Sequence, residues 1–196
     1  MTSQQTTLNH PTSLTNKIAV IDLETTEYNP RKGHIVEIGI CLLDTQTGEI
    51  TKLLDTPVLE DPKFNDWAWI FDNSSLTPEM VRKAPTWDSL KKSVQDICNA
   101  YKITAFNKEF DLGFLSAKGI KCPHQINCIM LACTPICQIP KDWGDPSDPF
   151  KWPKAIEAWQ YFYPAIPYEE EHRAYSDSVA EAKILWALIQ RQKQSK

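Results

Sequence analysis

The first part of the chain has a hydrophobic pattern typical of β-strands. Apolar residues dominate segments 17–23, 35–43 and 50–59, and the turn sequence QTGE separates the second segment from the third. We therefore predict three strands, of which the last two form a hairpin.

The middle of the chain changes to a helical pattern. Thr77 and Pro78 are typical of a helix cap and a first helical turn. Within residues 86–101, apolar side chains recur at helical spacing: Trp87, Leu90, Val94, Ile97 and Tyr101. KITAF predicts a further short strand, and EFDLGFLSAKG predicts a helix that ends at Gly119.

The last part of the chain predicts a Pro-rich surface loop, IPKDWGDPSDPFKWP, and two helices near 154–163 and 173–190. A three-strand meander followed by strands that alternate with helices predicts the α/β class, with a mixed central sheet flanked by helices. We expect one domain over residues 17–190. The polar residues 1–16 predict a disordered leader and residues 191–196 a solvated basic tail.

Composition limits the classes of protein to consider. The 196 residues are 42% hydrophobic, which is typical of a globular domain with a core. No apolar run reaches the roughly 18 residues that span a bilayer, and the leader lacks the apolar core of a secretion signal. We therefore expect a cytoplasmic protein. The net charge of −4 does not favour tight sequence-independent binding to nucleic acid. A nucleic-acid enzyme stays open, because a metal site contributes acidic residues of its own.

Six cysteines raise the question of a zinc site. Potential ligands gather in KCPHQINCIMLACTPIC: Cys122, His124, Cys128, Cys133 and Cys137. The paired CxxC spacing of zinc sites is absent. We therefore favour a core-facing helix that buries cysteines as small apolar residues over a zinc site, and we expect reduced thiols.

The segment IAVIDLETT ends a hydrophobic strand with two acids. Side chains alternate along a strand, so Asp22 and Glu24 share one face. Adjacent carboxylates repel each other, and burial increases the cost. A divalent cation between them would compensate this repulsion. The alternative is a pair of solvated acids at a turn.

Two further acids and one histidine lie at predicted helix starts. Asp111 lies between Phe110 and Leu112, where the helix dipole favours an acid. Asp177 begins one of two apolar stripes on the last helix, so we expect it to be buried and to need a partner. His172 lies five residues earlier and, taken alone, is typical of a surface residue.

In this order, the motifs resemble the DEDDh family of 3′→5′ exonucleases, which includes the proofreading subunit of bacterial replicative polymerases and ribonuclease T. IDLETT resembles the first motif of that family, HIVEIG the strand after it, AFNKEFDLGFL the second motif and HRAYSD the third. The resemblance covers about residues 17–190. It implies five catalytic positions: Asp22, Glu24, Asp111, His172 and Asp177.

The resemblance implies a ribonuclease H-like fold and hydrolysis with two Mg²⁺ or Mn²⁺ ions. Asp22 would bridge the two ions. Glu24 and Asp177 would hold one of them, and Asp111 would reach the other through water. Such ions prefer carboxylate oxygens, and a pair roughly 3.5–4 Å apart stabilises the attacking and leaving oxygens. His172 would accept a proton from the attacking water, a role that suits imidazole at neutral pH.

The resemblance also implies contacts with the 3′ end of a substrate, through Leu23, Thr25, Thr26, Asn107 and Phe110. Leu23 would lie against the terminal base, although strand alternation directs it away from Asp22. Backbone N–H groups around Thr25 and Thr26 would contact the 3′ end. Asn107 and Phe110 would line the cleft, and Phe110 also suits core packing.

The sequence departs from the family in two places. Glu27 stands where the family often has Gly, and SSLT, residues 74–77, replaces a His-Gly-Ile-Thr stretch, so substrate preference stays open. Three aromatic residues lie just upstream at alternating positions: Trp67, Trp69 and Phe71. They could stack on bases, but alternation favours core or edge-strand packing. Glu37 matches a family acid that is not a metal ligand.

We therefore predict a metal-dependent 3′→5′ exonuclease that hydrolyses phosphodiester bonds at single-stranded DNA or RNA ends and releases nucleoside 5′-monophosphates. One alternative is an RNA-trimming or oligoribonucleotide exonuclease. Another is a polymerase-associated editing subunit that mainly binds and has minor activity. The expected partner is nucleic acid with a single-stranded 3′ end, and a polymerase or a second copy of the chain is a further candidate. No membrane partner is expected.

Overall fold

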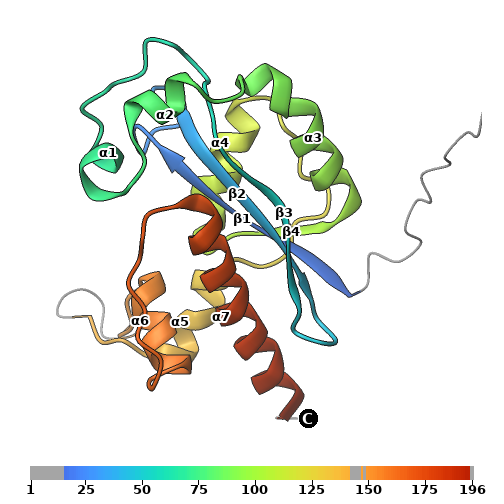
Figure 1. Cartoon of the computed structure of the whole chain (residues 1–196). Coiled ribbons are helices and arrows are strands. Elements are labelled where there is room, and N and C mark those ends of the chain that lie inside the picture. The colour runs from blue at the N-terminus through green and yellow to red at the C-terminus, as the bar shows by residue number, and fades with distance from the viewer. Residues whose placement is uncertain (1–15, 142–146, 148, 195–196) are drawn as a thin grey trace, which may run out of the picture.

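A four-stranded mixed sheet forms the centre of the molecule (Figure 1). The computed structural model describes residues 16–141, 147 and 149–194, so the expected leader lies outside the described residues up to position 15. β1 (Lys17–Thr25), β2 (Ile35–Asp44) and β3 (Ile50–Pro57) form an antiparallel meander. β4 (Lys102–Thr104) pairs parallel to β1. The order β3-β2-β1-β4 confirms the predicted mixed sheet.

One face of the sheet packs against the helices from the middle of the chain. α3 (Trp87–Ala100) and α4 (Lys108–Ala117) lie on this face. Ala19, Ile21 and Leu23 of β1 share a buried cluster with residues of both helices. The regular alternation of β1 directs these three side chains to the same side.

The opposite face of the sheet packs against the C-terminal helices (Figure 1). These are α5 (Ile129–Cys137), α6 (Ala155–Phe162) and α7 (Ala174–Gln194). α7 lies across β1 and β2. Ile18 and Val20 of β1 belong to the cluster on this side. The sheet is thus covered by helices on both faces, as predicted.

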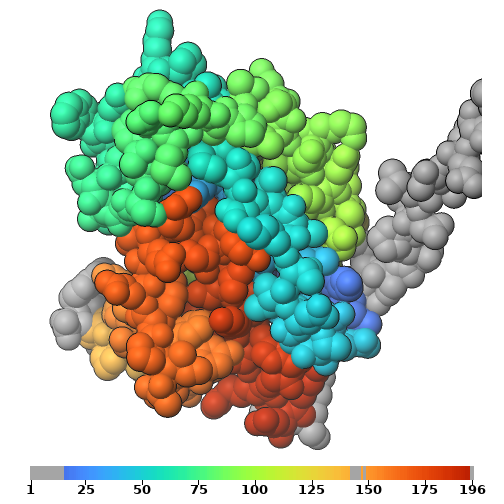
Figure 2. Space-filling model, viewed as in Figure 1, coloured from blue at the N-terminus to red at the C-terminus, as the bar shows by residue number. Residues whose placement is uncertain are grey.

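Two short helices, α1 (Trp69–Asn73) and α2 (Pro78–Arg82), form a separate small cluster beside β2. Ile70 and Val81 are buried there with Val36 of β2. Figure 2 shows this teal and green region next to the orange segment that precedes α7. The expectation of core or edge-strand packing is wrong for the two tryptophans of this region, because Trp67 is 87% and Trp69 57% exposed.

Side-chain caps define where two of the helices begin. Thr77 accepts a hydrogen bond from the N–H of Met80, and Pro78 occupies the first turn of α2, as predicted. Thr86 caps α3 by accepting from the N–H of Ser89. Each cap satisfies an N–H group that has no partner within its own helix.

The last helix and the cysteines complete the comparison with the predicted elements. α7 continues to Gln194, so part of the expected tail is helical, because Arg191 and Lys193 suit a helix C-terminus.

Cys128 and Cys133 are buried against the C-terminal helices, in keeping with the interpretation that the cysteines pack as small apolar residues. Across the described residues, no helix combines the length and the apolar character needed to cross a membrane.

Candidate active site

The two acids at the end of β1 lie on the face of the sheet that α7 covers. In the ladder between β1 and β2, Asp22 lies opposite Gly39, and Glu24 lies opposite Glu37. Val20, two residues before Asp22, is packed in the cluster under α7. Strand alternation therefore directs both carboxylates toward the N-terminal end of α7.

The start of α7 brings a third acid and the histidine to Glu24. Ligand atoms of Glu24, His172 and Asp177 all lie within 4.8 Å of one another. One oxygen of Asp177 accepts the hydroxyl of Tyr168 at 3.1 Å, and the other accepts the N–H of Arg173 at 3.1 Å. Asp177 therefore caps the start of α7 by accepting the N–H of Arg173, and it also faces the acids of β1.

Asp111 reaches the same strand end from α4. β4 pairs with β1 only from Ile18 to Val20, so β1 continues beyond its parallel neighbour. The N–H of Leu23 donates instead to Oδ1 of Asp111 at 3.2 Å. Asp111 is 3% exposed. At Leu23, β1 has no pairing with β4, and its N–H binds Asp111 instead. This hydrogen bond holds Asp111 beside the end of β1 that carries Asp22 and Glu24.

Burial and mutual repulsion raise the pKa values of these acids. For Asp22 the largest cause is burial, followed by the charge of Glu181 and then that of Glu24. Burial also raises the pKa of Glu24, and the charge of Asp177 adds to it. Burial raises the pKa of Asp111 to about 8 and that of Asp177 to about 6. Carboxylates so arranged are stabilised in their charged form by a cation.

A fifth acid, Glu181, belongs to this cluster and was not predicted. It lies one helical turn after Asp177, is 5% exposed, and accepts the N–H of Phe106 at 3.2 Å. Burial raises its pKa, and the charge of Asp111 adds to the shift. The spacing of four residues from Asp177 is the sequence signal that could have identified it, because such residues share a helix face.

His172 has a backbone conformation that is rare for residues other than glycine. Its φ is 49°, in the left-handed region, which costs roughly 1–3 kcal/mol. Its ring contacts Trp69 of α1 edge-on, with 4.9 Å between ring centroids. The imidazole is therefore held between the acids and an exposed aromatic ring.

The structure shows the contacts that the expected substrate residues at and just after the end of β1 make within the protein. The side chain of Leu23 is 4% exposed in the core, on the face opposite the acids, so its N–H and not its side chain is at the site. Thr25 donates its hydroxyl to the carbonyl of Glu27 at 2.9 Å. Thr26 exchanges hydrogen bonds with His34, which ties the two ends of the β1–β2 connection together.

Asn107 and Phe110 line a groove of about 990 Å³ at the start of α4. Asn107 is exposed immediately before α4, and the ring of Phe110 lies 6.1 Å from that of Tyr28 at an angle of 64°. Tyr28 is 88% exposed, and the far side of the groove carries Leu131 and Trp152, which are 51% and 65% exposed. The groove thus offers aromatic faces beside the first turn of α4, which also carries Asp111.

The side chains of this cluster fit a divalent cation. The carboxylates of Glu24 and Asp177 offer hard oxygen donors, which suit Mg²⁺ or Mn²⁺. Burial and repulsion raise the pKa values of Asp22 and Glu24, and burial raises that of Asp111, so the charged forms of all three are opposed in the protein alone. Within the described residues, no cysteine belongs to such a group of ligands, so zinc at the cysteines gains no support.

Comparison with known protein families matches more than half of the chain to one family. A family model described as an exonuclease (RNase T) matches residues 19–133. The match includes Asp22, Glu24 and Asp111 and ends before α7 begins. His172 and Asp177 lie outside the matched residues, and the fold brings them to the matched acid Glu24.

Two curated relatives and one solved structure are similar over most of the chain. DNA polymerase III PolC-type of Clostridium perfringens is 26% identical over 90% of this chain, and the 3′-5′ exonuclease DinG of Bacillus subtilis is 24% identical over 91%. The chain spans 11% and 18% of the lengths of these two relatives. The nuclease domain of 3′hExo, a DEDDh family member bound to rAMP, has a TM-score of 0.62 at 18% identity, with 92% of each chain covered.

Proposed function

Since the family model matches 115 of the 196 residues, from 19 to 133, the chain belongs to the exonuclease family, and from this premise we propose that it is a metal-dependent 3′→5′ exonuclease. It hydrolyses the terminal phosphodiester bond of a single-stranded 3′ end and releases a nucleoside 5′-monophosphate. The observation that carries this proposal is the convergence of Glu24, His172 and Asp177 within 4.8 Å. Asp111 adds to it through its hydrogen bond with Leu23.

Each acid of the cluster has a part in the proposed site. Asp22 and Glu24 at the end of β1, Asp177 on α7 and Asp111 on α4 would hold two divalent cations. Bound there, the cations supply positive charge that stabilises the attacking and leaving oxygens. The protein keeps the four carboxylates in place beforehand through the β1–β2 ladder and the hydrogen bonds to Leu23 and Arg173.

His172 is the proposed general base. Its imidazole lies beside Glu24 and Asp177, and it is the side chain of this group that can accept a proton from a water at neutral pH. Water then attacks the terminal phosphorus, and the bond to the 3′ oxygen of the preceding nucleotide breaks. Trp69 supports one edge of the imidazole.

The groove beside Phe110 is the proposed path of the strand. Base faces stack on aromatic side chains without regard to sequence, and this needs unpaired bases. Tyr28, Phe110 and Trp152 present such faces in this groove, and Phe110 directly precedes Asp111 in α4. The net charge of −4 offers little attraction for phosphates, so the groove and the cations carry the binding.

A labelled-oligomer assay tests the activity. Full-length protein with Mg²⁺ or Mn²⁺ is expected to shorten a 5′-labelled single strand stepwise from its 3′ end, and a chelator is expected to stop it. Asp22→Asn removes a charge and keeps the shape of the side chain, so activity should fall at least 1,000-fold, on the order of the loss of a central catalytic group. His172→Ala should also be strongly impaired. Undiminished activity in Asp22→Asn would reject the assignment.

The same assay, run on matched DNA and RNA strands, tests which sugar the enzyme prefers in its substrate. One curated relative is a DNA polymerase, and the similar 3′hExo domain was bound to rAMP, so the two relatives point to different sugars. The 2′-hydroxyl is what distinguishes the substrates. Faster cleavage of RNA favours the RNA-trimming alternative. Co-elution with a polymerase in gel filtration, together with weak cleavage of both strands, favours the editing-subunit alternative.

A further inference from the structure

A buried ion pair lies beside the active site without taking part in the proposed chemistry. Glu37 of β2 lies directly opposite Glu24 and is 1% exposed. Two like charges at directly opposed positions of a ladder destabilise a sheet. A second buried acid next to Glu24 therefore needs a compensating partner.

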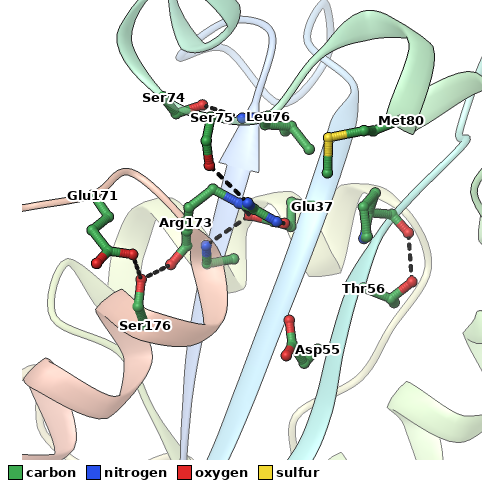
Figure 3. Close-up of polar contacts among 12 residues, drawn as sticks. Glu37, Asp55, Thr56, Ser74, Ser75, Leu76, Met80, Glu171, Arg173 and Ser176 are labelled. Carbon is green, nitrogen blue, oxygen red and sulfur yellow. Dashed lines mark hydrogen bonds and ion pairs between the residues drawn. The ribbon is translucent and has the colours of Figure 1, made fainter.

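That partner is Arg173, at the start of α7. Its Nη2 donates to Oε1 of Glu37 at 2.6 Å, and its Nε lies 3.0 Å and 3.1 Å from the two carboxylate oxygens. The N–H of Ala174 donates to Oε2 of Glu37 at 2.9 Å. Figure 3 shows the guanidinium of Arg173 directed at Glu37, with the loop residue Ser75 on its other side. Nη1 of Arg173 donates to Ser75 at 2.9 Å.

These contacts hold the residues on both sides of Arg173. His172 precedes it, and the N–H of Arg173 itself donates to Asp177. A left-handed backbone such as that of His172 persists only when its surroundings determine it. Glu37 binds the two residues that follow His172 in the chain, Arg173 and Ala174, from a rigid strand.

We propose that Glu37 and Arg173 are a pair of positioning residues, which place His172 and Asp177 against Glu24. This proposal rests on the proposed exonuclease function. Neither residue holds a cation or touches the substrate. Both oxygens of Glu37 are occupied by Arg173 and Ala174, so Glu37 acts through α7 and not as a further metal ligand.

Glu37→Gln tests the pair, because the amide keeps the size of the side chain and loses its charge. The turnover number kcat should fall about 10–100-fold, as is usual when a residue that orients metal ligands is lost. KM should stay within about twofold, because the groove is unchanged. The dissociation constant for Mn²⁺, measured by titration calorimetry without substrate, should rise about tenfold or more.

Glu157→Gln is the matched control. Like Glu37, Glu157 accepts a hydrogen bond from a basic side chain, Nζ of Lys151 at 2.5 Å. It also accepts one from a backbone N–H at the start of a helix, that of Lys154 at 2.7 Å, but this helix is α6. The control should keep the kcat, KM and Mn²⁺ affinity of the unaltered protein. A purely stabilising role for Glu37 would lower the melting temperature of Glu37→Gln and leave its kcat and Mn²⁺ affinity per folded molecule unchanged, which would overturn the proposal.

Arg173→Lys provides the second test and decides the question if Glu37→Gln does not fold. Lysine keeps the positive charge but cannot make the forked contact with both oxygens. We expect an intermediate loss of kcat and of Mn²⁺ affinity, and values equal to those of the unaltered protein would overturn the proposal. If the unaltered protein cleaves no 3′ end, the exonuclease assignment fails, whereas the Mn²⁺ titrations still test the pair.

Discussion

Glu181 shows how a single carboxylate can influence the site without being one of its four acids. Its side chain is buried one turn beyond Asp177, and its charge is the second largest cause of the raised pKa of Asp22, after burial. Because its Oε2 accepts the N–H of Phe106, the side chain has a fixed position. A negative charge in this cluster would increase the attraction for the cations that we propose at Asp22.

The substitution Glu181→Gln separates charge from shape. Its amide oxygen can still accept the N–H of Phe106, so the fold should be retained. We expect Mn²⁺ to bind about tenfold more weakly at pH 7.5, since one nearby negative charge is lost at an effective dielectric constant of about 20. Titration calorimetry measures this. An unchanged affinity would show that Glu181 is not charged in the metal-bound protein.

Single residues also show how much of the candidate site could be predicted from the sequence. Asp22 and Glu24 could be placed on one face from strand alternation alone, and the resemblance supplied Asp111 and Asp177. Glu181 belongs to no motif, and its spacing of four residues from Asp177 places it on the same helix face without indicating how deeply it is buried. The role of Arg173 depends on Glu37, 136 positions away, and no local pattern indicates such a pair.

At the scale of elements, the site depends on how closely α7 approaches β2. A Cβ atom added to Gly39 would lie 2.2 Å from the carbonyl carbon and oxygen of Ala174. Backbone atoms cannot give way as a flexible side chain can. The absence of a side chain opposite Asp22 therefore lets the first turn of α7 reach the acids of β1.

Gly39→Ala is expected to push the start of α7 away from the sheet. A displacement of about 1 Å at reacting groups costs roughly 100-fold in rate, so kcat should fall by about this factor, with a lower melting temperature. Gly113→Ala is the control for stability, because an added Cβ there meets nothing within 4 Å. It should melt at the same or a higher temperature. A normal kcat in Gly39→Ala would contradict the close approach.

Short elements were harder to predict than long ones. The three long strands and α3 followed from clear periodicity and agree closely with the structure. α1 has five residues, too few to show a helical period, and the alternation of its aromatic residues favoured core or edge-strand packing. β4 has three residues, too few to show a period, and its position became clear only from its pairing with β1.

At the scale of the whole molecule, the cluster of acids makes folding dependent on pH when cations are absent. The folded pKa values of Asp111, about 8, and Asp177, about 6, lie above the unfolded value of 3.8. Between these values the folded state binds more protons than the unfolded state. The stability that each group contributes is complete below about pH 4 and is lost as pH rises through its folded pKa.

The melting temperature in chelator should therefore decrease between pH 5.5 and pH 8.5. Asp111→Asn removes one of the titrating groups and should reduce this decrease. Added Mn²⁺ should raise the melting temperature most at pH 8.5, because it binds the charged carboxylates of the folded state. Calorimetric scans at four pH values would measure both effects, and a melting temperature that rises with pH in chelator would contradict the burial of these acids.

The distribution of the catalytic residues along the chain affects when activity can begin. Glu24 leaves the ribosome before Asp177, which lies 153 positions later, on a helix that must dock before the two meet. On the proposed function, a growing chain, or a fragment that stops before α7, lacks His172 and Asp177 and should cut no nucleic acid. Activity would then begin only after α7 has folded onto the strands that were made before it.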